Sequence, residues 1–289
     1  MIIGNNKKRE LLYQLINNKN IPHALLFSGP EMIGKKMIAL DFVDKIFGDN
    51  KYNPDINIIS PIDGNIEIDE IRKAKQKLSL KSYYGKLKVL IIDDSHLMKK
   101  DAQNAFLKML EEPKGDTLII FITAYPQMIL KTIKSRMQEM KFSLIGKKEI
   151  EDHLMSLGAS KEKAFEIALI SSGQIGKAIN FLESQEKIDL FNNSMDDMVN
   201  LLNSKMKKRF EYAEKFKDDK DKINSTIDIW ERFLRRELLI KIFNYKGGRL
   251  NYSIQKIKNI IDELEKMKYM IENSNANKKL LLENLLIKL

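Results

Sequence analysis

A glycine-containing loop between a short apolar run and an amphipathic segment limits the folds open to this chain. The loop is Ser28–Lys36; it follows the apolar run Ala24–Phe27, and apolar residues then recur at helical spacing. A strand, a glycine loop and a helix in this order form a phosphate loop, in which backbone N–H groups surround phosphates and a lysine contacts the terminal phosphates. Gly29, Gly34 and Lys35 fit this pattern. We therefore expect an α/β protein with a nucleotide-binding architecture.

The next residue departs from the pattern at the atom that should hold the metal. A serine or threonine hydroxyl normally ligates Mg²⁺ there, whereas Lys36 carries an ammonium group without a lone pair.

A second candidate element is an acidic pair: the apolar run Val89–Ile92 ends in Asp93 and Asp94. Asp93 fits the metal-binding aspartate of such ATPases, and Asp94 stands where the longer glutamate normally orients the attacking water. A carboxylate displaced by about 1 Å can lower the rate about 100-fold, so the shorter Asp94 is expected to impair hydrolysis. The alternative for the acidic pair is a capping turn.

Strands and helices alternate through the first half of the chain. The apolar runs predict strands at Ala24–Phe27, Asp55–Ile59, Val89–Ile92 and Leu118–Ile122. Helical periodicity precedes the first strand at 9–19 and lies between the strands at Lys35–Phe47, Ile68–Leu80 and Ala102–Glu112, with the last helix stopping at Pro113. This alternation predicts a mostly parallel sheet covered by helices on both faces.

Beyond residue 143 the strand signals fade. Short helices are expected at 147–155, 161–171 and 176–184, followed by long amphipathic helices to the end of the chain. We therefore expect an α/β phosphate-loop domain at 1–143, a small helical domain at 144–190 and a helical C-terminal domain at 191–289.

Composition excludes several classes of site. The chain has no cysteine and 3 histidines, which excludes disulfides and cysteine-bound zinc and argues against a histidine metal site. No run approaches the roughly 20 apolar residues of a membrane span, and the first residues lack the pattern of a signal peptide. A cytoplasmic location without a membrane partner is expected. The net charge of +10 favours polyanionic partners such as nucleic acid, although many of the lysines are expected simply to solvate helix faces.

The order of these elements resembles the delta-prime subunits of the bacterial DNA polymerase III clamp loader, within the AAA+ family. The resemblance is carried by Pro22–Phe27, Asp55–Ile56, Ile68–Arg72, Val89–Asp94, Ala102–Pro113 and Thr132–Gln138. It covers roughly residues 1–185 and is weaker afterwards, at Trp230–Phe233 and Asn275–Leu280. It implies an AAA+ domain, a helical lid at 144–190 and a C-terminal collar at 191–289 through which the subunits assemble.

In that family the arginine of a Ser-Arg-Cys motif reaches into the ATP site of the neighbouring subunit. Arg136 occupies this position, with Met137 in place of the cysteine. A planar, always-charged guanidinium suits the stabilisation of phosphoryl-transfer charge in trans. The alternative for Arg136 is a surface ion pair.

Further departures concern the chain's own site. Tyr125 stands where active relatives carry a polar sensor, and Gly176 stands where they carry a sensor arginine on the lid. With Lys36 and Asp94, these changes leave Arg136 as the catalytic position that is kept. The resemblance therefore implies a subunit that completes another subunit's ATP site rather than running its own.

The expected partners and cofactors follow from the same resemblance. They are the other clamp-loader subunits, motor ATPase and delta-like, bound through the C-terminal domain, with the sliding clamp and primed DNA in the complex. No cofactor is required, and weak binding of ATP or ADP at Gly29, Gly34, Lys35, Lys36, Asp93 and Asp94 is left open. The family's zinc module is not expected, because residues 48–54 are too short for it and contain no cysteine. The alternatives are an active AAA+ ATPase, as the motor of the same assembly or a related remodeller, and a separate DNA-binding or nuclease protein.

Overall fold

The computed structural model describes residues 2–48, 53–62, 64–83, 87–112, 115–217, 219–274 and 276–289. Predictions that involve Pro113, Asn275 and residues 49–52 of the segment 48–54 lie outside these residues. The chain folds into two compact units. The first comprises Met1–His153 with Gly173–Gly176, and the second comprises Leu154–Ser172 with Lys177–Leu289.

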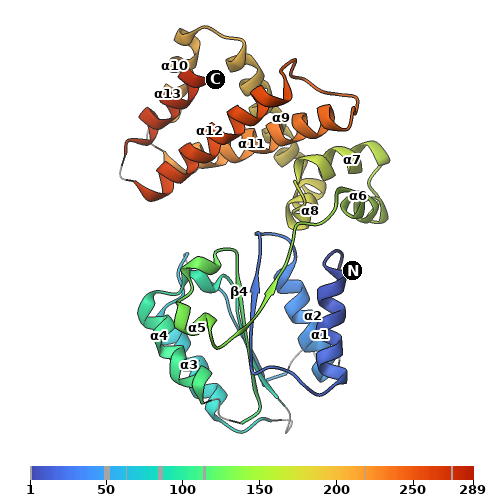
Figure 1. Cartoon of the computed structure of the whole chain (residues 1–289), viewed down its shortest axis with the longest axis vertical. Coiled ribbons are helices and arrows are strands. Elements are labelled where there is room, and N and C mark those ends of the chain that lie inside the picture. Colours follow the sequence, from blue (N-terminus) through green and yellow to red (C-terminus); the bar gives the residue numbers. More distant parts are fainter. Residues whose placement is uncertain are drawn as a thin grey trace. The chain divides into compact units, whose positions relative to one another are not determined.

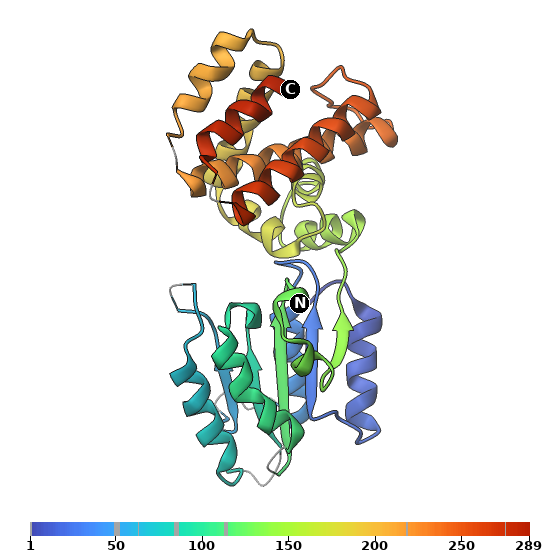
Figure 2. The same cartoon turned by 60° about the vertical axis from the view of Figure 1, so that its left-hand side comes forward.

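The first unit is built on a five-stranded sheet in the order β2-β3-β4-β1-β5. Its strands are β1 (Ala24–Ser28), β2 (Ile56–Ile59), β3 (Lys88–Ile92), β4 (Thr117–Thr123) and β5 (Gln138–Lys141). Every pairing is parallel, and Figure 2 shows the strands running side by side in one direction. The predicted parallel α/β sheet is confirmed.

Alternate residues of the central strands enter two separate cores, because successive side chains of a strand point to opposite faces. On β1, Leu26 packs toward one core and Leu25 and Phe27 toward the other. Figure 1 shows α3, α4 and α5 on one face and α1 and α2 on the other. Both faces of the sheet are therefore covered, as the continuous apolar runs of β1, β3 and β4 require.

Four helices of this unit follow the predicted segments closely, and α5 was not predicted. These helices are α1 (Asn6–Asn17), α2 (Lys35–Phe47), α3 (Ile68–Ser79), α4 (Lys100–Glu111) and α5 (Lys131–Lys134), with short 3₁₀ helices at Ser95–Leu97 and Pro126–Met128. Strand β5 was not predicted. Its sequence is mostly polar, and Met140 is its one buried residue.

The second unit is helical. The chain from the end of the sheet onward contains α6 (Lys147–Ser156), α7 (Lys161–Ile170), α8 (Ile175–Glu183), α9 (Gln185–Leu202), α10 (Met206–Glu214), α11 (Lys220–Ile242), α12 (Ile254–Asn273) and α13 (Lys278–Lys288). Trp230 of α11 is fully buried and donates its indole N–H to the carbonyl of Ser194 at 3.1 Å. The division into three domains stays a prediction. Within the described residues, each helix is too short or too polar to pass through a lipid bilayer.

Candidate functional site

The backbone of Ser28–Lys36 has the geometry of a phosphate loop. Gly29 has a φ of 145°, and a Cβ there would lie 2.3 Å from the carbonyl oxygen of Phe142. Gly34 has a φ of 91° and directly precedes α2. Both positions therefore require glycine, the first for close backbone approach and the second for its left-handed conformation.

Lys35 lies inside the loop. Its ammonium group donates hydrogen bonds to the carbonyl oxygens of Gly29 at 2.7 Å and Pro30 at 2.6 Å. Only 6% of Lys35 is exposed. Burial lowers the pKa of Lys35, and the charges of Asp94, Glu31 and Asp93 partly offset that effect. The ammonium group of Lys35 is thus held against the backbone of the loop.

Lys36 joins the start of α2 to the ends of two strands. Its Nζ lies 2.9 Å from Oδ2 of Asp93, which follows β3. The same ammonium group donates to Oγ of Ser60, which follows β2, at 3.1 Å. Because the strands are parallel, their carboxyl ends meet at one edge of the sheet, and Lys36 reaches across this edge.

A magnesium ion does not fit these residues. P-loop ATPases hold Mg²⁺ between the hydroxyl that follows the loop lysine and an aspartate at a strand end. Here the hydroxyl is replaced by Lys36, whose ammonium group already binds the Asp93 carboxylate. In the part of the chain that the structure describes, no group of three or more acidic or histidine side chains is placed to hold a metal.

The second acidic residue sits in a constrained turn. Asp94 has a φ of 44° at the start of a 3₁₀ helix, but its side chain makes no capping hydrogen bond. Its N–H donates to Oδ1 of Asp93 at 3.2 Å. Burial, followed by the charge of Asp93, raises the pKa of Asp94. A carboxylate in this environment is less favoured than an exposed one.

Tyr125 packs on a histidine of the same edge. Its ring lies 4.8 Å from that of His96, centroid to centroid. Nδ1 of His96 lies 3.3 Å from Oγ1 of Thr123, which accepts the Tyr125 N–H at 3.0 Å. Burial lowers the pKa of His96. Tyr125, which was predicted to stand in place of a polar sensor, therefore packs its aromatic ring on His96 at this edge.

Gly176 contacts the phosphate loop directly. Its N–H donates to the carbonyl of Met32 at 2.7 Å, and a Cβ on Gly176 would lie 3.1 Å from Cβ of Met32. The side-chain amide of Gln174 donates to the carbonyl of Glu31 at 3.1 Å. Sequence reasoning identified Gly176 as a missing arginine and did not find these contacts, because the partners lie more than a hundred residues apart in the chain.

Arg136 lies at the end of α5, next to α4. Its Nη2 forms an ion pair with Oε1 of Glu111 at 2.6 Å. Its Nη1 donates to the carbonyl of Thr132 at 2.8 Å and to Oγ of Ser135 at 3.3 Å. The side chain is 36% exposed, so the guanidinium is oriented yet still reachable from outside.

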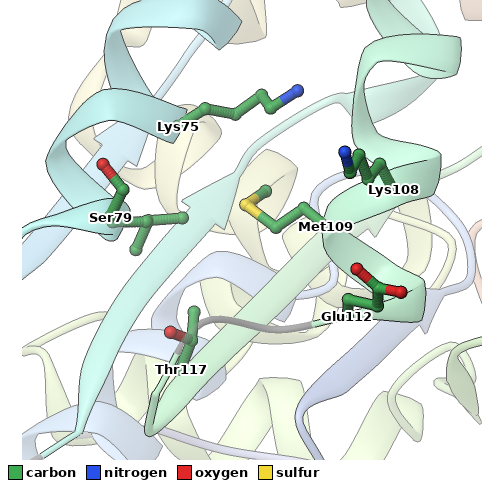
Figure 3. A pocket seen from close by; sticks show the side chains of 7 residues that line it. Lys75, Ser79, Lys108, Met109, Glu112 and Thr117 are labelled. Carbon is green, nitrogen blue, oxygen red and sulfur yellow. The ribbon is translucent and has the colours of Figure 1, made fainter.

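A separate pocket of about 280 Å³ lies between α3 and α4. It is lined by Lys75, Leu78, Ser79, Lys108, Met109, Glu112 and Thr117. Figure 3 shows Lys75 and Lys108 on the two helices that flank it. Thr117 begins β4, whereas Ser28 pairs with Thr123 at its end. The pocket thus lies at the amino-terminal end of β4, whereas the phosphate loop lies at the carboxyl-terminal end of the strands.

Comparison with known proteins places this geometry in context. Residues 4–145 match the family model described as DNA polymerase III, delta subunit. The chain is 28% identical over 201 residues to DNA polymerase III subunit delta' of Bacillus subtilis, covering 62% of this chain and 61% of that protein. It is 27% identical over 183 residues to a Replication factor C small subunit of Aeropyrum pernix, covering 61% of this chain and 55% of that protein.

The chain thus spans between about half and three fifths of the length of these curated relatives. Among solved structures, a variant of Thermotoga maritima RuvB is similar with a TM-score of 0.50 and 17% identity, covering 93% of this chain and 88% of that one. That likeness supports an AAA+-like fold for the sheet and the helices that follow it.

Proposed function

We propose that this chain is a member of the family of DNA polymerase III delta-prime and related clamp-loader subunits, to which it is similar, and that it acts in DNA replication as a non-hydrolysing subunit of such an assembly. In this role it helps load a sliding clamp onto primed DNA. Its own phosphate loop performs no hydrolysis, and Arg136 completes the ATP site of a neighbouring subunit. The observation that carries the proposal is the ion pair of 2.9 Å between Lys36 and Asp93.

The ion pair bears on hydrolysis because phosphoryl transfer needs a cation that bridges the phosphates. Mg²⁺ neutralises the charge that develops between the β- and γ-phosphates, and a carboxylate positions the attacking water. At this edge Asp93 is bound to an ammonium group, and Asp94 carries a shorter side chain than the acid that normally positions the water. Metal binding and the positioning of the attacking water are therefore both impaired, at two consecutive residues.

Arg136 keeps what a group acting in trans requires. A guanidinium is always charged and presents several donors in a fixed plane. One edge of Arg136 is fixed by Glu111 and by the carbonyl of Thr132, while the side chain remains 36% exposed. Such an arrangement limits the rotamers of the arginine before a partner subunit approaches, which lowers the entropy lost on binding.

The remaining parts of the proposal concern organisation and partners. The domains are an AAA+ domain at 1–143, a lid at 144–190 and a collar at 191–289. The collar contacts the other clamp-loader subunits, and the sliding clamp and primed DNA are bound within the complex. The subunit is an accessory of the polymerase holoenzyme, requires no metal of its own and acts in the cytoplasm.

The test combines the chain alone with the assembled complex. The purified chain should hydrolyse ATP no faster than background, and Arg136→Ala should lower the ATPase rate of the complex about 10³-fold or more at the site it serves, without dissociating it. Arg72→Ala is the matched control, since Arg72 is an exposed arginine of α3 that pairs with Asp69 of the same helix. Complex turnover that is unchanged by Arg136→Ala would refute the role in trans.

The second candidate function is an active ATPase, which the glycine geometry and the buried Lys35 favour. It predicts turnover by the chain alone that Lys35→Ala abolishes. Turnover at background level would exclude it.

A further inference from the structure

The metal position of the phosphate loop is filled by a side chain of this protein. The two protein atoms that hold Mg²⁺ in P-loop ATPases belong to the residue after the loop lysine and to an aspartate at a strand end. In this chain they are Lys36 and Asp93, and Nζ lies 2.9 Å from Oδ2. We propose that Lys36 permanently replaces the divalent cation: the loop excludes Mg²⁺ and holds a nucleoside polyphosphate through its own ammonium groups, without metal.

Exclusion of Mg²⁺ follows from charge and coordination. The ion requires oxygen ligands at about 2.0–2.1 Å in octahedral geometry, and an ammonium group has no lone pair to offer. Lys36 also donates to Oγ of Ser60 at 3.1 Å, so it is fixed from two sides. A Mg²⁺ ion at the Asp93 carboxylate would have to displace this ammonium group and would be repelled by its charge.

The loop nevertheless keeps the features that bind an anion. Lys35 is 6% exposed and donates to two neutral carbonyl oxygens. Among the described residues, no carboxylate oxygen lies within 4.0 Å of its Nζ. A buried ammonium group without an ion-pair partner is costly, and a phosphate would neutralise it.

The backbone supports the same reading. The 13-residue helix α2 begins after Gly34, which has no side chain to cap the first N–H groups. Uncapped N–H groups at a helix start attract phosphate oxygens. The ammonium of Lys36 has donated two of its three hydrogens, to Asp93 and Ser60, and retains one for a phosphate.

The inference rests on the proposed loss of hydrolysis at this loop but not on Arg136 or on any partner subunit. It is tested with the full chain alone. Isothermal titration calorimetry with ADP and with ATP is carried out in EDTA and again in excess Mg²⁺. We expect binding in EDTA, with equal or weaker binding in Mg²⁺, because Mg²⁺ also competes for the nucleotide in solution.

Two substitutions of the same residue separate charge from metal ligation. Lys36→Thr restores the hydroxyl and frees Asp93, so its affinity should fall about 10- to 100-fold in EDTA and recover in Mg²⁺. Lys36→Met removes the charge without adding a ligand, so its affinity should fall in both buffers. Lys45→Thr, on an exposed position of the same helix, should bind as the unmodified chain does.

Several results would overturn the inference. They are nucleotide binding that requires Mg²⁺, no binding in either buffer, or a Lys36→Thr variant that behaves as the unmodified chain in both. If Lys36→Thr fails to fold by circular dichroism, Lys36→Met decides. A chain that hydrolyses ATP with Mg²⁺ overturns the proposed function as well, whereas one that binds ADP only with Mg²⁺ and hydrolyses nothing overturns this inference alone.

Discussion

The buried carboxylate of Glu237 joins three segments of the helical unit. The residue is fully buried. Its Oε1 accepts a hydrogen bond from Nη1 of Arg236 at 2.7 Å, and its Oε2 accepts the backbone N–H groups of Arg249 at 2.7 Å and Leu250 at 2.9 Å. Arg236 also pairs with Glu166 of α7 at 3.1 Å. One carboxylate thus ties α11 to the segment before α12 and, through Arg236, to α7.

Glu237→Gln should lower the free energy of unfolding by about 3 kcal/mol. Glutamine keeps the shape and one carbonyl oxygen. If that oxygen stays on the two backbone N–H groups, the side-chain NH₂ faces the Arg236 guanidinium, and two donors oppose each other. Removing one partner of a buried pair costs roughly 3–5 kcal/mol, and the low end applies because Arg236 retains Glu166.

The assay uses the single tryptophan of the chain, Trp230, which is buried in α11 of the same unit. Its fluorescence during urea unfolding reports on the helical unit, and an unchanged m-value validates the comparison between variants. Glu166→Gln is the matched control, expected to cost less than about 1 kcal/mol because the Glu166 side chain is 50% exposed. A loss below about 1 kcal/mol for Glu237→Gln, or equal losses for the two variants, would refute the reasoning.

Two further predictions concern the first unit. Because the folded state raises the pKa of Asp94, this residue binds more protons in the folded than in the unfolded chain, and stability falls as pH rises from the ordinary pKa of aspartate through the raised one. Asp94→Asn should therefore raise the free energy of unfolding by up to about 1 kcal/mol near neutral pH, and not at pH values below this window. Urea unfolding that shows the same gain at acidic pH would contradict this prediction. Gly29→Ala should destabilise by about 2–4 kcal/mol, because its Cβ would lie 2.3 Å from the carbonyl oxygen of Phe142. Gly146→Ala has no such contact and should change stability by less than about 1 kcal/mol in guanidinium unfolding followed by circular dichroism.

The central strands were predictable because burial on both faces leaves a continuous apolar run. β3 and β4 are buried along their whole length, and their sequences are almost entirely apolar. β5 escaped prediction because it lies at the edge of the sheet, where one neighbour, β1, fixes its conformation through backbone hydrogen bonds. Its residues Gln138–Lys141 carry little hydrophobic pattern, so tertiary context decides.

The candidate site shows the same limit. The left-handed conformation of Gly34, the close backbone approach at Gly29 and the helix start at Lys35 were predictable because a phosphate-loop pattern lies in consecutive residues. The contacts of Lys36 with Asp93 and of Gly176 with Met32 join distant segments, and no local pattern announces them. Spacing along one element can place residues on a face, but it does not say which distant group will meet them.

The Lys36 ion pair changes what the retained aspartate means. In the sequence, Asp93 suggested a metal site that had lost one ligand. In the structure its carboxylate neutralises Lys36, so replacing Asp93 alone would leave the ammonium group without its ionic partner. The two residues therefore depend on each other, and Asp93 has a reason to be acidic that is independent of catalysis. An acidic residue at this strand end is consequently no evidence for hydrolysis in a chain whose loop carries a lysine at the metal position.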